Sequence, residues 1–227
     1  MQRIASQHLP YVRQRLQETG LWFVDIPRTS TTAIKQALAQ NFGKLYGKRG
    51  VRQGVQRGLV PDHTPVAVMR EQLGSGLWDG LRTFSIVRNP WDRILSLYLY
   101  RTRIEGDTDV PFEEYVERLH AHRTAADDDS PDPLFRYHGH HYGCADFLLD
   151  EDGQLAVARV VRFEQRDQEL ADLAREWNLR VLAHGQARIG ATGHHHYSAY
   201  YDAERRRLLE EAYADDVERW AYRFETD

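Results

Sequence analysis

An arginine and four consecutive hydroxyl residues, Arg28 to Thr32, stand between two apolar stretches of the chain. The stretch before them, residues 21–26 (LWFVDI), has the continuous apolar pattern of a buried strand, and the stretch after them repeats apolar residues at helical spacing. The amino end of a helix exposes unpaired backbone N–H groups and the positive end of the helix dipole, which attract anions. We therefore expect this junction to bind an anionic group.

A second arginine occupies the same kind of position further along the chain. Residues 81–87 (LRTFSIV) have the pattern of another buried strand, Arg88 follows them, and residues 91–98 place their apolar side chains on one face of a helix. Ligands of open α/β sheets bind beyond the carboxyl ends of the strands, where both turns are expected. One ligand with two separated anionic groups fits this pair of arginines.

The first junction does not match an ordinary ATP or GTP P-loop. It lacks the sequence G-x-x-x-x-G-K-[ST], and hydroxyl residues replace the glycines, while the order of strand, anion loop and helix is kept. A P-loop-like ATP-dependent kinase is therefore the second enzyme hypothesis, disfavoured also by the missing acidic magnesium site.

Two motifs resemble those of a known enzyme family. Residues 26–38 (IPRTSTTAIKQAL) resemble the 5′-phosphosulfate loop of sulfotransferases, written P-K-[ST]-[GA]-[GST]-[ST]. Residues 84–100 (FSIVRNPWDRILSLYLY) resemble the family's 3′-phosphate motif, in which an arginine ends a strand and a serine follows eight residues later. Residues 194–224 are similar to the end of the carbohydrate-sulfotransferase-like branch, which includes bacterial members. The resemblance spans roughly residues 20–224.

The resemblance implies 3′-phosphoadenosine 5′-phosphosulfate as the co-substrate, 3′,5′-adenosine bisphosphate as the product, and no metal. It assigns the 3′-phosphate to Arg88 and Ser96, because a guanidinium matches phosphate geometry. The family usually has lysine where Arg28 stands, and this lysine neutralises the bridging oxygen as the bond breaks. Arginine supplies that charge as a wider, planar group. The residues that would hold the 5′ end are Arg28, Thr29, Ser30, Thr31, Thr32 and Ala33.

Several of these residues also have a purely structural interpretation. The hydroxyl residues from Thr29 to Thr32 also suit the capping of a helix, which is compatible with ligand binding. Ser96 on its own is typical of a small residue on a solvated helix face. Arg88 on its own is typical of a surface ion pair. The lysine-to-arginine departure at Arg28 supports a third hypothesis, a nucleotide-binding protein of the same fold that has lost catalysis.

Sulfuryl transfer is an in-line displacement that benefits from a base for the acceptor hydroxyl. Related carbohydrate sulfotransferases have a catalytic histidine or glutamate between the two motifs, and His63 is the only histidine there. We predict that His63 is the base, with the adjacent Asp62 as a candidate to fix its tautomer or raise its basicity. The alternative is a capping or core histidine. Glu71 is the reserve candidate, and Lys35 lies too far into the helix to replace the usual lysine.

Two later segments extend the predicted nucleotide site. Residues 162–170 (RFEQRDQEL) resemble the family's strand-to-helix segment near the adenine, with Phe163 in place of the aromatic that packs on the ring and Arg162 near the nucleotide. Ordinary core packing is the equal alternative for Phe163. Arg188 and Gly193 to His195, with His194 among them, fall where the family has a late loop that closes over the nucleotide.

Two histidine-rich segments and two charged segments could bind a metal ion or an acceptor. The clusters in residues 137–143 and 193–198 lack HExxH or paired acidic patterns, so we predict no metal site and assign the first cluster to the acceptor pocket. The acidic run 127–129 is interpreted as a solvated loop. A basic segment is either a solvated loop or a rim that attracts an anionic acceptor. Its residues are Lys44, Lys48, Arg49, Arg52 and Arg57.

Length and composition limit the number of domains, the partners and the location to be expected. The 227 residues, with a formal net charge of −4, favour one domain (1–227) and argue against a nucleic-acid partner. The chain shows no apolar run of membrane-spanning length and no signal-peptide pattern, and its one cysteine, Cys144, suits a reducing compartment, so a cytoplasmic location is expected.

Alternating strands and helices indicate an α/β, P-loop-NTPase-like three-layer fold with a mainly parallel central sheet flanked by helices. The expected strands cover residues 21–26, 81–87 and 158–163. The expected helices cover residues 3–18, 32–42, a short stretch after residue 65, 91–98, 109–123, 165–178 and 202–224, and Asp202 is the expected N-cap of the last one. The expected function is sulfation of a hydroxyl on a carbohydrate or small-metabolite acceptor. The sequence does not identify that acceptor or the oligomeric state.

Overall fold

The computed structural model describes residues 3–42, 59–106, 109–125, 132–135, 139–179 and 192–226. The chain divides into two compact units, each built from two segments of the sequence. Unit 1 comprises Met1–Val87 and Asp146–Ile189, and unit 2 comprises Arg88–Ala145 and Gly190–Asp227. The residues of the expected single domain are thus shared between two units.

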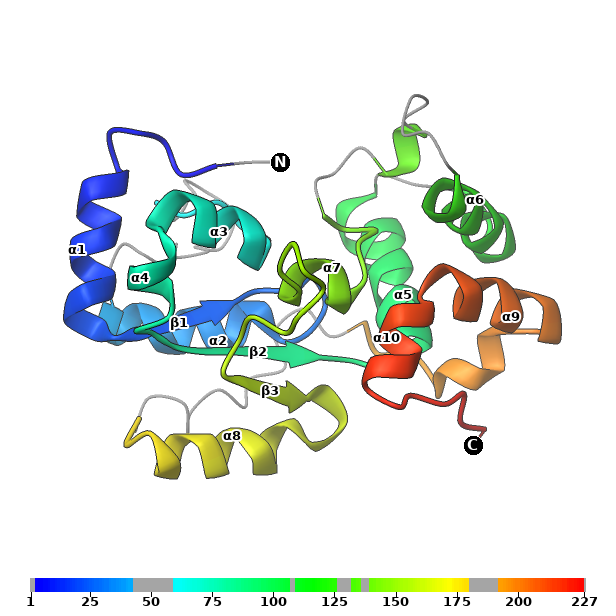
Figure 1. The fold of residues 1–227 in the computed structure, drawn as a ribbon. Helices are drawn as coiled ribbons and strands as arrows, with labels where there is room; N and C mark the ends of the chain where they lie inside the picture. The colour runs from blue at the N-terminus through cyan, green and yellow to red at the C-terminus, as the bar shows by residue number, and fades with distance from the viewer. Residues whose placement is uncertain are drawn as a thin grey trace. The chain divides into compact units, whose positions relative to one another are not determined.

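Unit 1 contains a parallel three-stranded sheet (Figure 1). The strands β1 (Leu21–Val24), β2 (Arg82–Val87) and β3 (Arg159–Arg162) are hydrogen-bonded in the order β1-β2-β3. All three strands lie within the segments predicted from apolar runs, so the mixed α/β class and the parallel sheet are confirmed. Parallel strands need crossover connections, which the helices between these strands provide.

The strands β1 and β2 are buried along almost their whole length, and β2 buries the polar residues Thr83 and Ser85 together with its apolar ones. All four residues of β1 are buried, and in β2 only Arg82 at its start is exposed. The rings of Phe23 and Phe84, which are register partners, lie 4.9 Å apart between centroids. The edge strand β3 has only Val161 fully buried. Nearly uninterrupted burial therefore distinguishes β1 and β2 from β3, and the buried hydroxyls of Thr83 and Ser85 are hydrogen-bonded to backbone groups of β1 and of the segment before β3.

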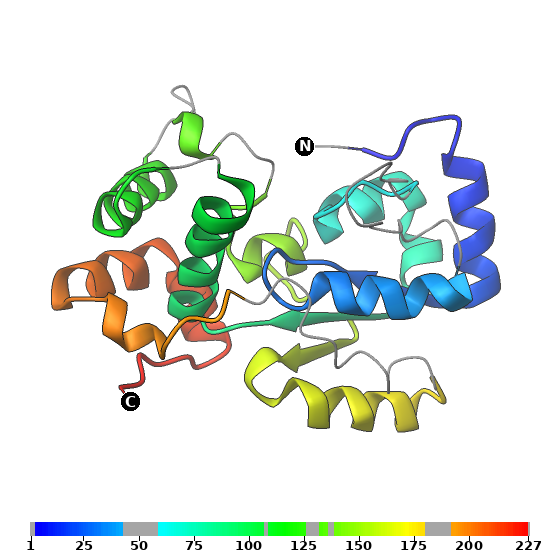
Figure 2. The same cartoon turned by 180° about the vertical axis from the view of Figure 1, so that it is seen from behind.

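Helices cover both faces of the sheet in unit 1. Figures 1 and 2 show α3 (Val66–Leu73) and α4 (Ser75–Trp78) on one side of the strands and α8 (Arg166–Glu176) on the other. Among the described residues of this unit, the other helical elements are α1 (Leu9–Thr19), α2 (Thr31–Phe42) and the 3-10 turn η4 (Phe163–Gln165). The short helix α7 (Cys144–Leu148) contains the boundary between the units.

The first helix begins later than predicted. The sequence pattern placed its start at residue 3, whereas α1 runs from Leu9 to Thr19 and carries Pro10 in its first turn. Proline lacks an N–H group and clashes with the preceding turn, so it fits only where the helix starts. The end agrees with the prediction, because Gly20 takes a left-handed conformation with φ 61°.

Unit 2 is helical. In the described residues it contains α5 (Pro90–Tyr100), a π-helical turn η2 (Arg101–Glu105), α6 (Phe112–Thr124), 3-10 turns at Pro133–Phe135 and Tyr197–Tyr200, α9 (Ala203–Ala212) and α10 (Ala214–Arg219). Asp202 accepts a hydrogen bond from the Arg205 amide at 2.8 Å, which confirms its predicted role as N-cap of α9. The final helix predicted over residues 202–224 is confirmed in part, because it ends at Arg219 and is interrupted at Tyr213. This buried tyrosine donates its hydroxyl to the carbonyl of His141.

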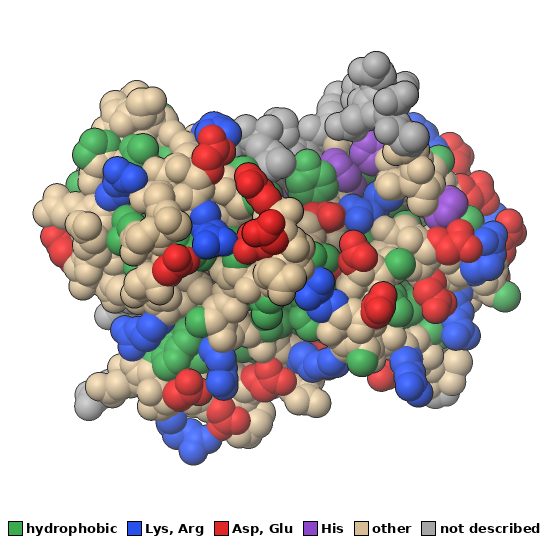
Figure 3. Space-filling model, viewed as in Figure 1, with side chains coloured by type: hydrophobic (Ala, Val, Ile, Leu, Met, Phe, Trp, Pro, Cys, Tyr) green, Lys and Arg blue, Asp and Glu red, His purple; other side chains and the backbone are tan. Residues whose placement is uncertain are grey.

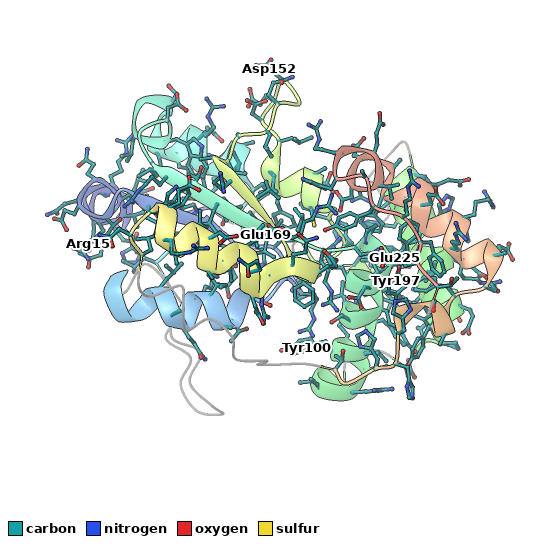
Figure 4. All side chains as sticks on the ribbon, turned by 90° about the horizontal axis from the view of Figure 1, so that it is seen from below. Arg15, Tyr100, Asp152, Glu169, Tyr197 and Glu225 are labelled. Atoms are coloured by element: carbon teal, nitrogen blue, oxygen red, sulfur yellow. The ribbon has the colours of Figure 1, made fainter. Side chains whose placement is uncertain are left out.

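Aromatic residues join the last segment of the chain to α5. The Trp91 indole donates to the carbonyl of Arg206 at 3.1 Å, and its ring meets Phe224 edge-on at 5.5 Å. Tyr197 and Glu225 lie next to each other in Figure 4, where the Glu225 amide donates to the Tyr197 hydroxyl at 2.7 Å. The contacts of Trp91 fix the amino end of α5, which begins two residues after Arg88.

A buried carboxylate also organises unit 2. Asp216 accepts hydrogen bonds from the amides of Cys144 and Ala145, both at 2.7 Å. Gly143 packs so closely that a Cβ atom built there would lie 2.9 Å from Asp216 Oδ1. The absence of a side chain at Gly143 is therefore a requirement of this packing.

Replacing Gly143 with alanine should lower the free energy of unfolding by about 1–3 kcal/mol, because the new methyl group displaces Asp216 from its two amide donors. Urea denaturation followed by circular dichroism measures the change. Gly76→Ala is the matched control, since a Cβ at Gly76 in α4 meets nothing within 4 Å and alanine favours helix. Equal stability of Gly143→Ala and the parent would contradict this account.

Candidate active site

The predicted anion turn of unit 1 is a strained strand-to-helix junction. Arg28 and Ser30 both have left-handed backbone conformations, with φ 67° and 70°, and the buried Thr29 lies between them. Such conformations are costly for residues other than glycine and concentrate at functional sites. Alternation of backbone conformation of this kind also turns successive N–H groups toward one side, forming an anion-binding nest.

Two hydroxyls of the turn brace its backbone. Thr29 Oγ1 and Thr31 Oγ1 both donate to the carbonyl of Ile26, at 2.9 and 2.6 Å. Their protons are therefore used within the turn, and an anion there would take its hydrogen bonds from backbone amides and other side chains. The helix α2 begins directly afterwards, with the Ile34 amide donating to the carbonyl of Ser30.

An arginine that the sequence did not single out reaches this turn. Arg166, the first residue of α8, donates from Nη1 to the Ser30 hydroxyl at 2.6 Å. Its guanidinium lies 5.7 Å from the centre of the Phe163 ring and pairs with Asp167 at 2.7 Å. Phe163 therefore supports a cation beside the anion turn, a role that its predicted position beside a nucleotide did not include.

The other predicted residue of this segment, Arg162, is the last residue of β3. Its backbone amide donates at 2.9 Å to Glu169 of α8, which Figure 4 labels. This hydrogen bond ties the end of the strand to the helix that carries Arg166. The Arg162 side chain is half-buried.

The predicted base, His63, lies against the residue that follows β1. His63 Nδ1 is 3.2 Å from both the carbonyl oxygen and the carboxylate Oδ2 of Asp25, and the His63 amide also donates to Oδ2 at 3.2 Å. The backbone of His63 is left-handed, with φ 59°. The same Asp25 oxygen accepts from Lys35 Nζ at 2.6 Å, and Lys35 reaches Asp62 at 2.5 Å.

This cluster corrects one expectation. The carboxylate at His63 belongs to Asp25, and the adjacent Asp62 pairs with Lys35 instead. Sequence adjacency misled because the left-handed turn at His63 directs neighbouring side chains differently. Glu71, the reserve base, is exposed on α3 and forms an ion pair with Arg3.

Charge pairing determines the protonation of the cluster. Burial by itself would raise the pKa of Asp25, but the Lys35 ammonium and His63 together lower it to about 2. Burial would likewise lower the pKa of Lys35, whereas Asp25 and Asp62 raise it above its ordinary value. Asp25 and Lys35 are therefore a buried carboxylate and ammonium at neutral pH.

The second predicted arginine is held by a carboxylate within unit 2. Arg88 donates from Nε to Asp92 Oδ2 at 2.8 Å, and its Nη2 lies 2.7 Å from the same oxygen. The other Asp92 oxygen lies 3.0 Å from His194 Nε2, and His194 Nδ1 is 2.8 Å from the Thr192 hydroxyl. Asp92 thus joins Arg88 to the late loop. Asp92 lies four residues after Arg88, a spacing at which side chains near a helix start can pair. This spacing was the signal in the sequence that could have indicated the contact.

The remaining predicted residues of unit 2 are also placed. Ser96 is 2% exposed, which excludes the interpretation as a residue on a solvated helix face. Asn89 caps α5 by accepting from the amides of Trp91 and Asp92. Gly193 has φ 59°, a conformation that favours glycine, and His195 is exposed.

Several expectations lie outside the described residues. These are the basic segment from Lys44 to Arg57, the acidic run 127–129, residues 137–138 of the first histidine cluster, and Arg188. Among the residues that are described, no group of three or more histidine, cysteine, aspartate or glutamate side chains is arranged to hold a metal. Likewise, no helix within the described ranges has the length and apolarity for a bilayer crossing. On the face drawn in Figure 3, basic and acidic side chains are interspersed.

Comparison with known proteins gives one limited similarity. Over 73 residues the chain is 32% identical to an uncharacterized protein of Archaeoglobus fulgidus, a match that covers 32% of this chain and 61% of that protein. The matched part is thus less than two thirds of the relative's length, and the relative brings no activity with it. No protein-family model matches the chain, and no solved structure matches it.

Replacing Lys35 with methionine should lower the free energy of unfolding at pH 7 by about 3 kcal/mol, because Asp25 then stays buried with its ammonium partner removed. Asp25 contributes stability above its unfolded-state pKa near 4, and this contribution is lost as pH falls through about 2. The difference between variant and parent should therefore shrink as pH falls from 4 to 2. Urea denaturation across this range measures it.

Arg3→Met serves as the control for that experiment, since it breaks the exposed pair with Glu71 and should change stability little. A Lys35→Met variant as stable at pH 7 as Arg3→Met would show that the buried pair is not needed.

Proposed function

We propose that this chain is a sulfotransferase that moves the sulfuryl group of 3′-phosphoadenosine 5′-phosphosulfate to a hydroxyl of a carbohydrate or small metabolite. The observation that carries this proposal is the contact of His63 with Asp25, only three residues before Arg28. The predicted base and the predicted phosphosulfate turn were chosen from separate motifs, and His63 contacts the residue that opens the segment leading from β1 to that turn. The strand, anion turn and helix of this unit also support a P-loop-NTPase-like three-layer fold.

The proposed reaction is an in-line displacement at sulfur. The acceptor oxygen forms a bond to sulfur, the bond from sulfur to the 5′-phosphate oxygen breaks, and the acceptor proton passes to His63. The products are the sulfate ester and 3′,5′-adenosine bisphosphate. Charge that develops on the leaving phosphate is stabilised by the amides of the turn and by Arg28, where the family usually has lysine. Arg166, held at the Ser30 hydroxyl, supplies a second cation.

The 3′-phosphate is assigned to Arg88 and Ser96 by the resemblance. Asp92 accepts from Nε and Nη2 of Arg88 and so fixes the plane of the guanidinium. A fixed plane favours recognition of a phosphate over recognition of a single charge, because donors in a fork match its oxygens. This contact would distinguish the donor from ATP and AMP, which have no 3′-phosphate.

A second candidate function is a nucleotide-binding protein without catalysis, favoured by Arg28 in place of lysine. We further propose a cytoplasmic location, because the single cysteine, Cys144, is buried and forms no disulfide. No nucleic acid is proposed as a partner.

Replacing Arg88 with methionine should weaken binding of 3′,5′-adenosine bisphosphate by about 10- to 100-fold, since charged hydrogen bonds to the 3′-phosphate are lost. Isothermal titration calorimetry measures this, and the much weaker binding expected for AMP and ATP should not change. Arg207→Met, which alters an exposed ion pair on α9, is the matched control. A larger rise in the melting temperature of the parent with ATP than with 3′,5′-adenosine bisphosphate would favour the kinase instead.

Replacing His63 with glutamine should lower kcat for transfer of labelled sulfate by about 10²- to 10⁴-fold and leave the affinity for 3′,5′-adenosine bisphosphate unchanged. An acceptor panel of sugars and small alcohols supplies the substrate, and His8→Gln is the control. Full activity of the glutamine variant across pH would remove His63 as the base. Tight binding of the bisphosphate with no transfer by the parent to any acceptor would favour the non-catalytic protein.

A further inference from the structure

We propose that Asp25 is the positioning residue for His63, holding its imidazole in the tautomer that carries the proton on Nδ1, with Lys35 clamping Asp25 in place. The use of this tautomer as a base rests on the proposed function. The tautomer itself and the charge cluster are properties of the folded chain that can be measured without any substrate.

The surroundings of Nδ1 determine the tautomer. Both atoms of Asp25 within 3.2 Å of Nδ1, the backbone carbonyl oxygen and carboxylate Oδ2, accept hydrogen bonds and donate none. Only an Nδ1 that carries hydrogen satisfies them. In the neutral imidazole the lone pair then resides on Nε2, which is the atom that takes a proton from an acceptor.

The carboxylate also fixes the direction of the ring. Oδ2 of Asp25 accepts from the His63 backbone amide and also lies beside Nδ1, so the backbone and the ring of His63 are held by the same atom. The left-handed backbone of His63 brings its amide and ring to the same partner. Two hydrogen bonds to one oxygen restrict rotation of the ring more than one bond does.

Lys35 keeps Asp25 an acceptor. The Asp25 side chain is 4% exposed and the Lys35 side chain 13%, and their charged atoms are 2.6 Å apart. A protonated carboxyl could donate to His63 and reverse the tautomer, whereas the ionised form only accepts. Asp62 pairs with the same ammonium, so the four side chains are linked in the order Asp62, Lys35, Asp25, His63.

The cluster links the base to the anion turn. Asp25 begins the segment that leads from β1 to Arg28, and Lys35 lies one turn into α2. The groups that orient the base are therefore attached to the two elements that shape the anion turn. This arrangement fits a positioning role for Asp25 better than a role confined to stability.

The tautomer can be measured in the unaltered protein by ¹⁵N NMR of histidine-labelled chain near neutral pH. The His63 signals are assigned by their loss in His63→Gln. We expect Nδ1 to carry the proton in the neutral ring. A neutral His63 with its proton on Nε2 would overturn the proposal, whether or not the chain transfers sulfate.

The positioning role is tested with Asp25→Asn. The asparagine amide can donate to Nδ1, which favours the opposite tautomer, and we expect a shift of the NMR signals together with a fall in kcat of about 10²-fold or more. The KM for the donor should change less than about threefold, since a positioning residue acts on the chemical step. Asp172→Asn, an exposed substitution on α8, is the matched control.

The outcomes separate the two proposals. An Asp25→Asn variant that folds and keeps both the tautomer and kcat of the parent would overturn the positioning role. A parent with the expected tautomer but no sulfuryl transfer would overturn the proposed function and leave the tautomer assignment standing. If Asp25→Asn does not fold, the measurement on the parent protein still decides.

Discussion

The buried pair of Asp25 and Lys35 is the interaction on which the candidate site depends. The Asp25 side chain is 4% exposed, and burying its carboxylate is costly. The Lys35 ammonium, 2.6 Å away, offsets this cost. Because Asp25 follows β1 directly and Lys35 belongs to α2, their attraction fixes the ends of the turn that contains Arg28. The same carboxylate holds His63, so the turn and the candidate base share one electrostatic anchor.

Each unit contains a carboxylate that holds a functional side chain in one orientation. In unit 1, a carboxylate at the end of a strand orients a histidine, and in unit 2, Asp92 orients Arg88 and contacts His194. Cations and imidazoles on long or rotatable side chains lose entropy when they bind a ligand. A fixed acceptor behind each one removes part of this loss beforehand.

Local pattern predicted most of the secondary structure of this chain. The strands β1 and β2 were found because they are buried almost throughout and are therefore mostly apolar, with Thr83 and Ser85 as the buried polar residues of β2. The helix α9 was found with its cap, Asp202, because capping depends on residues that are neighbours in sequence. The errors fell where one residue overrides a pattern. Pro10 delays α1, and the buried Tyr213 interrupts the last helix.

The sequence by itself determined that Arg28 to Thr32 and Arg88 each follow a buried strand, since motif order and spacing are local properties, and it made His63 the candidate base. Only the tertiary structure decided which groups these residues meet. Asp25 and His63 are 38 positions apart, and Ser30 and Arg166 are 136 apart. Neither contact leaves a periodic signal, because the sheet and its crossover helices bring these segments together only after folding. The nearest acidic residue in sequence, Asp62, was therefore the wrong partner for His63, and the partner in space is Asp25.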